Sequence, residues 1–178
     1  MRRWSGAIVG WLIALALGWA GTPQVQARAA ILMDAETGQV LYAKNAHKPL
    51  PPASITKIMT AILVLERCDL DAVVKASKRA VNTEASSMHL RVGEEVKVRD
   101  LLYALMLRSA NDAAVALAEH AAGSVEAFAE LMNEKAQSLG AKRTRFVNPH
   151  GLHDPRHGST AYDLALITRY AMQNETFR

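Results

Sequence analysis

The chain of 178 residues contains one cysteine, Cys68, and therefore cannot carry an internal disulfide framework. Cys68 follows a long apolar run, so we interpret it as a small residue near the end of a helix. That interpretation outweighs a catalytic thiol, which would need an adjacent base. The sequence also lacks repeats, low-complexity segments and an interdomain linker, which indicates a single domain.

Strong charge of either sign is missing as well. The formal net charge is +4, and two arginines but no acidic residue lie in residues 1–27. The rest of the chain therefore carries a net charge of about +2. Such a mild balance gives no reason to expect a nucleic acid partner.

The longest apolar run near the N-terminus, Ala7 to Ala20, is too short for a comfortable membrane span, which needs about 20 residues. It follows two arginines and precedes Val25-Gln26-Ala27, which resembles a signal peptidase site. We predict a secretory signal peptide at residues 1–27, one domain at residues 28–178, and export from the cytoplasm. An uncleaved membrane anchor is the alternative for the same segment.

Ser54 and Lys57 form an S-x-x-K motif at the start of a predicted helix. The preceding Pro51-Pro52 suits a helix start, and Ile58 to Leu65 is so apolar that the helix is expected to be buried. Residues three apart on a helix are neighbours on one face, so hydroxyl and amine can meet. A lysine in an apolar setting loses its proton more easily and can act as a base. The alternative is an ordinary helix cap followed by a solvated lysine.

A second polar element, Ser109 and Asn111, interrupts an apolar helical pattern that begins at Leu101, and another helix is predicted to follow from Ala113 to Ala122. In a non-helical turn, side chains two apart can point the same way. A hydroxyl that relays a proton and an amide that holds a carbonyl would make a useful pair. The alternative is a plain turn between two helices, where Ser, Asn and Asp are frequent.

Five segments of the chain, taken together, resemble one family of serine enzymes. They are Ala30 to Tyr42, Pro52 to Lys57, Ser109 to Ala114, Phe146 to Leu152 and Ser159 to Ala165. The S-x-x-K and S-x-N motifs resemble those of the penicillin-recognising enzymes. The segments together resemble the D-alanyl-D-alanine carboxypeptidases, the low-molecular-mass penicillin-binding proteins, from about Ala29 to the last residue.

The resemblance implies an α+β fold with an antiparallel sheet packed against helices. It also implies hydrolysis of the terminal D-alanine of peptidoglycan pentapeptides outside the cytoplasm, at the cell wall and the outer face of the membrane. Ser54 would be the nucleophile, Lys57 the general base and Ser109 a proton relay, while Asn111 would bind substrate. β-Lactams would acylate the same serine, and no metal or organic cofactor is implied.

The family's third motif, K-T-G, is absent from these 178 residues. In the family it lies on a strand that helps to bind the terminal carboxylate. We therefore expect a C-terminally truncated domain, an N-terminal hairpin plus the helical subdomain, without the later strands or any C-terminal membrane anchor. A class A-like β-lactamase and a non-catalytic remnant remain as alternatives. The second motif of class A enzymes is usually S-D-N, whereas Ala110 stands at its middle position here.

The remaining elements follow from local patterns. A β-hairpin is predicted from residues 29–33 and 39–44 around Gly38. Residues 69–98 give only a mixed pattern, with Gly93 in a polar turn. A helix is predicted between a Ser124 cap and a Gly140 stop, and another over residues 161–173, where Thr160 to Asp163 resembles a capping box.

Three histidines, His150, His153 and His157, lie near Asp154 and raise the question of a zinc site. The prolines and glycines among them forbid the regular helix that a zinc-binding H-E-x-x-H motif needs. We interpret the segment as a loop beside the site.

Overall fold

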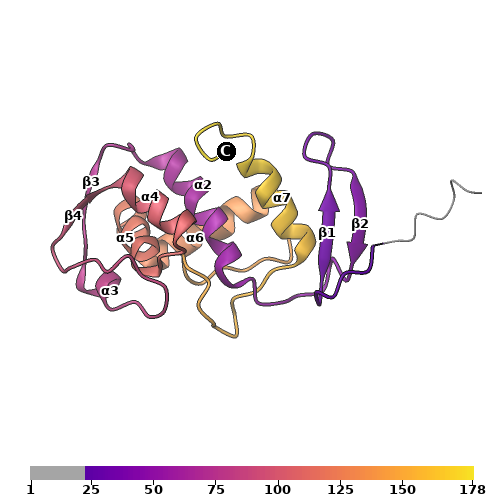
Figure 1. The fold of residues 1–178 in the computed structure, drawn as a ribbon, viewed down its shortest axis with the longest axis horizontal. Coiled ribbons are helices and arrows are strands. Elements are labelled where there is room, and N and C mark those ends of the chain that lie inside the picture. The colour runs from indigo at the N-terminus through magenta and orange to yellow at the C-terminus, as the bar shows by residue number, and fades with distance from the viewer. Residues whose placement is uncertain (1–22) are drawn as a thin grey trace, which may run out of the picture.

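The computed structural model describes residues 23–178, so most of the predicted signal peptide lies outside the described residues. Helices occupy the middle of the molecule, with one two-stranded sheet at each end of its long axis (Figure 1). The longer helices are α2 (Lys57–Arg67), α4 (Val98–Leu107), α5 (Asn111–Ala122), α6 (Val125–Ser138) and α7 (Ala161–Ala171). Among the residues described, none of the helices is long and apolar enough to cross a lipid bilayer.

The predicted first hairpin is present within one residue of its expected bounds. Strand β1 (Ala30–Met33) pairs antiparallel with β2 (Val40–Lys44). The turn between them is closed by Asp34, whose Oδ1 accepts hydrogen bonds from both N–H and Oγ1–H of Thr37. Arg169 of α7 donates to the carbonyls of Ala35 and Glu36, so the hairpin is tied to the last helix.

A second small sheet was not predicted, because residues 69–98 gave only a mixed pattern. Strand β3 (Val73–Lys75) pairs antiparallel with β4 (Glu95–Lys97), and a short helix, α3 (Lys78–Val81), lies between them. Strands of three residues are too short for a period of two to stand out in the sequence. Gly93, which the sequence placed in a polar turn, has a φ of +82° there.

The core is centred on α5, whose residues from Asn111 to Ala118 are all buried. This helix packs against α2, α3, α4 and α6. Its many alanines allow the neighbouring helices to approach closely, and larger side chains from those helices fill the space around it. The largest fully buried apolar side chains are Met59, Val64, Val98, Leu101, Leu105, Leu117, Phe128, Met132, Phe146 and Ile167.

The predicted helix caps are confirmed at two starts. Ser124 Oγ accepts from the N–H of Ala127, and Thr160 Oγ1 accepts from the N–H of Asp163. The last helix ends at Ala171, two residues before its predicted end. The helix after Ser109 begins at Asn111, two residues before the predicted start at Ala113.

Candidate active site

Ser54 lies in a short 3-10 turn, η1 (Ala53–Thr56), that runs directly into α2. The expectation that Ser54 occupies the first turn of an α-helix was wrong in this detail. Ala53 has a φ of +50°, a conformation that an α-helical start does not allow. The turn leaves Ser54 exposed to solvent while Lys57, three residues later, is only 2% exposed.

The amine of Lys57 has three oxygen neighbours. Its Nζ lies 3.3 Å from Ser54 Oγ, 2.7 Å from Asn111 Oδ1 and 2.9 Å from the carbonyl oxygen of His150. Burial lowers the pKa of Lys57 to about 8, because the charged form loses water there. The predicted meeting of hydroxyl and amine on one helical turn is thus present.

These three contacts suit both protonation states of the lysine. The ammonium form has three N–H groups and can donate to all three oxygens. The neutral amine keeps two N–H groups for the closer partners, Asn111 and His150. Its lone pair is then free to accept the hydrogen of the Ser54 hydroxyl. The arrangement can therefore withdraw a proton from Ser54 without any side chain moving.

Asn111 connects the lysine to the helix α5 and to an adjacent loop. It is 4% exposed, and its Nδ2 donates to the carbonyl of Glu84 while its backbone N–H donates to that of Ser86. Asn111 is the first residue of α5, so it does not lie in the non-helical turn expected for it. Its predicted contact with substrate stays a prediction.

Ser109 does lie in the turn between α4 and α5, with a φ of +56°. Positive φ is uncommon outside glycine, so the surrounding structure must hold this residue in place. Within residues 23–178, no hydrogen bond joins the Ser109 hydroxyl to Ser54 or Lys57. The proton-relay role of Ser109 stays a prediction.

Asp112 has a structural role that was not predicted from the sequence. Its fully buried carboxylate accepts hydrogen bonds from Ser87 Oγ and from the backbone N–H groups of Met88, Leu90 and Ala113. Burial opposes its ionisation, yet these hydrogen bonds together hold the pKa of Asp112 below its usual value. The carboxylate thereby fastens the loop at residues 84–90 beside Asn111.

The histidine-bearing loop borders the site, as the sequence indicated. Besides the His150 carbonyl on Lys57, the carbonyl of Pro149 accepts a hydrogen bond of 2.6 Å from Thr60 Oγ1 of α2. Burial lowers the pKa of His150 to about 4, and its Nδ1 accepts from the N–H of Leu152. In the part of the chain that the structure describes, no group of three or more His, Cys, Asp or Glu side chains is placed to hold a metal ion.

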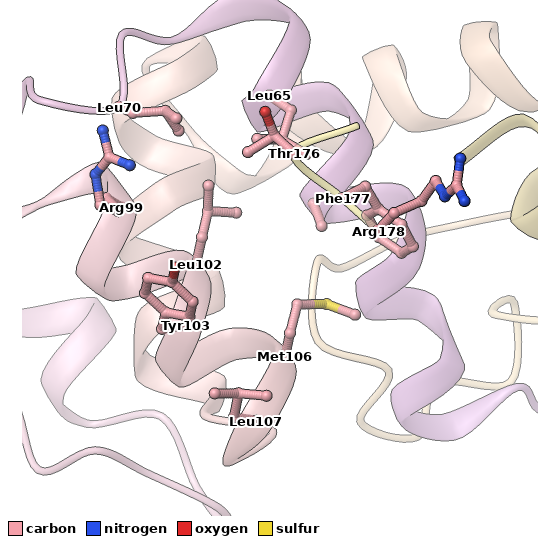
Figure 2. Close-up of a pocket in the computed structure, with 11 residues that line it drawn as sticks. Leu65, Leu70, Arg99, Leu102, Tyr103, Met106, Leu107, Thr176, Phe177 and Arg178 are labelled. Carbon is pink, nitrogen blue, oxygen red and sulfur yellow. The ribbon is translucent and has the colours of Figure 1, made fainter. Parts of the chain in front are cut away.

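Two other features lie outside this cluster. A cavity of about 350 Å³ between α2, α4 and residues 176–178 has none of the predicted site residues in its lining (Figure 2). Its walls include Leu102, Tyr103 and Phe177. Cys68 is half-buried, and burial raises the pKa of its thiol, which makes it a poor nucleophile.

An exposed serine with a desolvated lysine one turn away, held by an asparagine from another helix, is the arrangement of a serine acyl-transfer site with a lysine base. Residues 18–177 match the family model of peptidase S11, D-alanyl-D-alanine carboxypeptidase. The chain belongs to this family, and the resemblance noted from the five segments is confirmed.

Individual relatives agree with the family assignment. The chain is 41% identical over 156 residues to D-alanyl-D-alanine carboxypeptidase DacF of Bacillus subtilis, a match that covers 85% of this chain and 40% of the relative. The solved structure of D-alanyl-D-alanine carboxypeptidase DacD from Francisella tularensis is similar with a TM-score of 0.82 and 37% identity, covering 85% and 38%. An S216A mutant of the Streptomyces K15 DD-transpeptidase is similar with a TM-score of 0.83 and 40% identity, covering 88% and 65%.

These similarities confirm the predicted α+β fold of the DD-peptidase type, of which the chain covers a part. The chain spans about 40% of the length of the Bacillus subtilis relative.

Proposed function

We propose that the chain carries the acylation site of a serine-type D-Ala-D-Ala carboxypeptidase that trims peptidoglycan stem peptides outside the cytoplasm. The observation that supports this best is the position of Lys57 Nζ. It is buried, its pKa is lowered to about 8, and it lies within reach of Ser54 Oγ. A base with a pKa near the working pH is what general-base catalysis needs.

In the proposed reaction, Ser54 Oγ forms a bond to the carbonyl carbon of the penultimate D-alanine while Lys57 takes the hydroxyl proton. The C–N bond to the terminal D-alanine then breaks, and that amine leaves with a proton returned through Lys57 and Ser109. Water hydrolyses the ester and frees Ser54. The backbone N–H of Ser54 would be one donor to the oxyanion, and Asn111 would orient the substrate carbonyl.

The partners follow from this chemistry. A penicillin has a strained amide in place of the D-Ala-D-Ala bond and would acylate Ser54 in the same manner. None of these steps needs a metal or an organic cofactor. We further propose that residues 1–27 direct export, since the substrate lies in the cell wall.

The proposal for these 178 residues concerns the acylation half of the reaction. No K-T-G triplet occurs in the sequence, and relatives named transpeptidase share the same fold. Hydrolysis and transpeptidation differ only in which acceptor, water or an amine, reaches the acyl-enzyme. Acylation of Ser54 is therefore the step to test first.

The test is to mix the full chain with a labelled penicillin and to follow intact mass. A durable adduct that disappears in Ser54→Ala is expected, because a methyl group cannot form an ester. Rapid turnover of the penicillin would instead indicate a β-lactamase, and no adduct would indicate a non-catalytic remnant. An adduct that persists in Ser54→Ala, or that maps to Ser109, would sink the assignment of the nucleophile.

Release of D-alanine needs a second experiment. Residues 23–178 can be joined to the part of Bacillus subtilis DacF that the match leaves uncovered, where the resemblance places the K-T-G strand. This chimera should release D-alanine from a peptide ending in D-Ala-D-Ala, and its Ser54→Ala form should not. Labelling by penicillin without D-alanine release would show that the β-lactam acylates Ser54 while the peptide does not.

A further inference from the structure

Thr56 and His157 form a buried polar pair that the proposed reaction does not use. Thr56 stands between the nucleophile and the base in the sequence and is 0% exposed, while His157 is 4% exposed. Thr56 Oγ1 lies 2.9 Å from His157 Nε2, although 101 residues separate them. A buried hydrogen bond between distant segments at this position ties the nucleophile's turn to the histidine-bearing loop.

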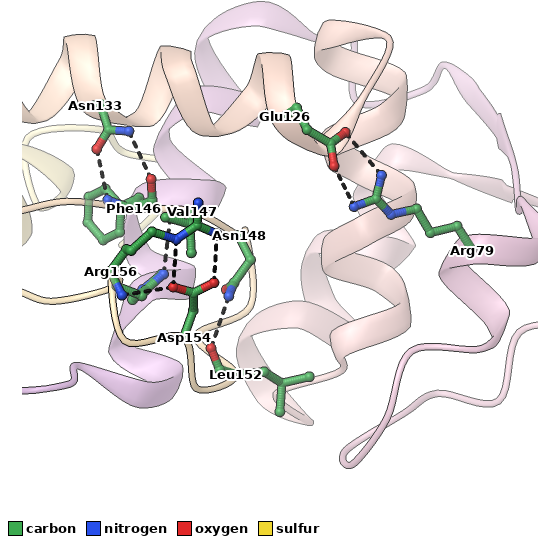
Figure 3. A network of polar contacts seen from close by, with 10 residues as sticks. Arg79, Glu126, Asn133, Phe146, Val147, Asn148, Leu152, Asp154 and Arg156 are labelled. Carbon is green, nitrogen blue, oxygen red and sulfur yellow. Dashed lines mark hydrogen bonds and ion pairs between the residues drawn. The ribbon is translucent and has the colours of Figure 1, made fainter.

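The surroundings of His157 decide which nitrogen carries the proton. Its Nδ1 accepts a hydrogen bond of 3.2 Å from the N–H of Val147, so Nδ1 has no proton of its own. Nε2 therefore carries the hydrogen and donates it to Thr56 Oγ1. Burial lowers the pKa of His157, and the nearby Asp154 acts in the opposite sense. Asp154 is itself paired with Arg156 (Figure 3).

The backbone that holds His157 is fixed by helix α6. Asn133 accepts from the N–H of Phe146 and donates to its carbonyl, both at 2.8 Å (Figure 3). The Phe146 ring meets the His157 ring edge to face at 5.5 Å between centroids. Val147, which orients the imidazole, follows Phe146 directly. The imidazole is thus mounted on a rigid support, not on a free loop.

The other end of the pair holds the turn that presents Ser54. Thr56 is the last residue of η1 and the residue before α2, so its side chain lies at the junction between Ser54 and Lys57. The turn begins at Ala53 with a φ of +50°, which needs outside support to persist. The carbonyl of Ala53 is covered by Gly151, where a Cβ would lie only 1.8 Å from the oxygen.

We propose that His157 is a positioning residue for acylation: through Thr56 it holds η1 so that Ser54 Oγ stays within reach of Lys57 Nζ. This inference rests on the proposed function, because it assigns a role within that reaction. Within residues 23–178, His157 makes no hydrogen bond to Ser54 and acts through the Thr56 hydroxyl. Misplacement of a reacting group by about 1 Å can cost roughly a hundredfold in rate.

Four substitutions distinguish the effect of losing the hydrogen bonds of this pair from the effect of changing side-chain volume. His157→Phe keeps a ring but removes both bonds, and His157→Gln keeps an N–H donor near the position of Nε2. Thr56→Val removes the hydroxyl at constant shape, and Thr56→Ser retains it. His153→Phe is the matched control, because His153 is exposed on the same loop.

The first measurement is the rate of Ser54 acylation by labelled penicillin in the full chain. His157→Phe and Thr56→Val should each slow acylation by about tenfold to a hundredfold. His157→Gln, Thr56→Ser and the His153→Phe control should stay close to the unmodified chain. The double variant Thr56→Val with His157→Phe should be no slower than His157→Phe alone, because Thr56 acts through its one bond to the imidazole.

The second measurement does not need activity. Competitive acetylation across a pH series, read by mass spectrometry, reports the pKa of Lys57 in the folded chain. The unmodified chain should show half-reaction near pH 8. In His157→Phe the midpoint should move toward the ordinary value of 10.5, because a loosened turn admits water to the amine. A purely structural role would lower the melting temperature and leave this midpoint in place.

The outcomes distinguish the inference from the proposed function. If penicillin labels Ser54 equally fast in the unmodified chain and in His157→Phe, and the Lys57 midpoint does not move, the positioning role is wrong while the function stands. If penicillin labels nothing, the function fails for this chain, and the Lys57 midpoint in Thr56→Val and His157→Phe still decides the role of the pair. Rescue by His157→Gln together with slowing by His157→Phe would establish that the donated hydrogen bond, not the ring, does the positioning.

Discussion

Lys57 Nζ lies 2.7 Å from Asn111 Oδ1, and the two residues are 54 positions apart. The contact joins the start of α2 to the start of α5 and so brings the S-x-x-K and S-x-N motifs into one cluster. An amide oxygen holds the lysine in place without a full negative charge. A carboxylate there would favour the ammonium form and weaken the base.

Asn111→Asp is expected to disable the base at neutral pH while changing almost no volume. A carboxylate at 2.7 Å should raise the pKa of Lys57 by about 1 unit or more, since opposite charges within a few ångströms shift a pKa by that amount. The fraction of neutral lysine at pH 7 then falls about tenfold, and acylation of Ser54 by penicillin should fall with it. The rate as a function of pH should move to higher pH.

The control for this change is Gln137→Glu, which adds the same charge on the exposed part of α6. It should leave both the rate and its pH dependence unchanged. An Asn111→Asp variant that acylates normally at pH 7 would contradict the view that neutral Lys57 is the base.

The acylation rate of the unmodified chain should rise with pH and level off above about pH 8, because the neutral amine is the reactive form and burial lowers the pKa of Lys57 to about 8. Lys57→Arg keeps the charge but cannot lose a proton. Its acylation rate should be at least about a hundredfold lower, the low end for general-base catalysis. That rate should also no longer rise with pH near pH 8. Stopped-flow labelling between pH 6 and about 10 measures both. A Lys57→Arg rate near that of the unmodified chain would assign the base to another group.

Lys57 should also make stability depend on pH. Its pKa is about 8 in the folded chain against 10.5 when exposed, so the unfolded state binds more protons between these values and stability rises with pH there. At roughly 1.4 kcal/mol per pKa unit, the gain amounts to about 3 kcal/mol, absent below pH 8 and complete above pH 10.5. Urea unfolding of the unmodified chain and Lys57→Met at several pH values tests this. The difference between their unfolding free energies should change by that amount, and a constant difference would refute the buried, neutral lysine.

The pairing of Ser54 with Lys57 could be predicted from the sequence because it depends on local spacing. Three residues make one turn in either a 3-10 or an α-helix, so the pair survives the wrong assignment of helix type. The hairpin and the capped helices were predictable for the same reason, since Gly38, Ser124 and Thr160 act on their immediate neighbours.

The rest of the site depends on the path of the backbone, which side-chain patterns do not reveal. The carbonyls of His150 and Glu84 hold Lys57 and Asn111, yet any residue supplies a carbonyl. The pairing of Thr56 with His157 joins segments 101 residues apart, and nothing in either segment's local pattern points to the other. The role of Asp112 could likewise not be predicted, because three of its four partners lie in the loop at residues 87–90 and the fourth is its neighbour in α5.

Gly151→Ala should disrupt the site far more than an equivalent change at another glycine of similar conformation. Gly151 and Gly123 have φ values of +87° and +80°, so an alanine costs conformational energy at both, about 1 kcal/mol. At Gly123 nothing lies within 4 Å of the added Cβ, whereas at Gly151 that atom would lie 1.8 Å from the carbonyl oxygen of Ala53. Either the loop or η1 must move, which separates Lys57 from His150 or displaces Ser54.

We expect Gly151→Ala to lose about 3 kcal/mol or more of unfolding free energy and most of its acylation rate. Gly123→Ala should lose only the conformational part and acylate normally. Thermal melts and penicillin labelling of the two variants measure this, and equal effects at both glycines would show that close contact between the loop and η1 does not hold Ser54 in place.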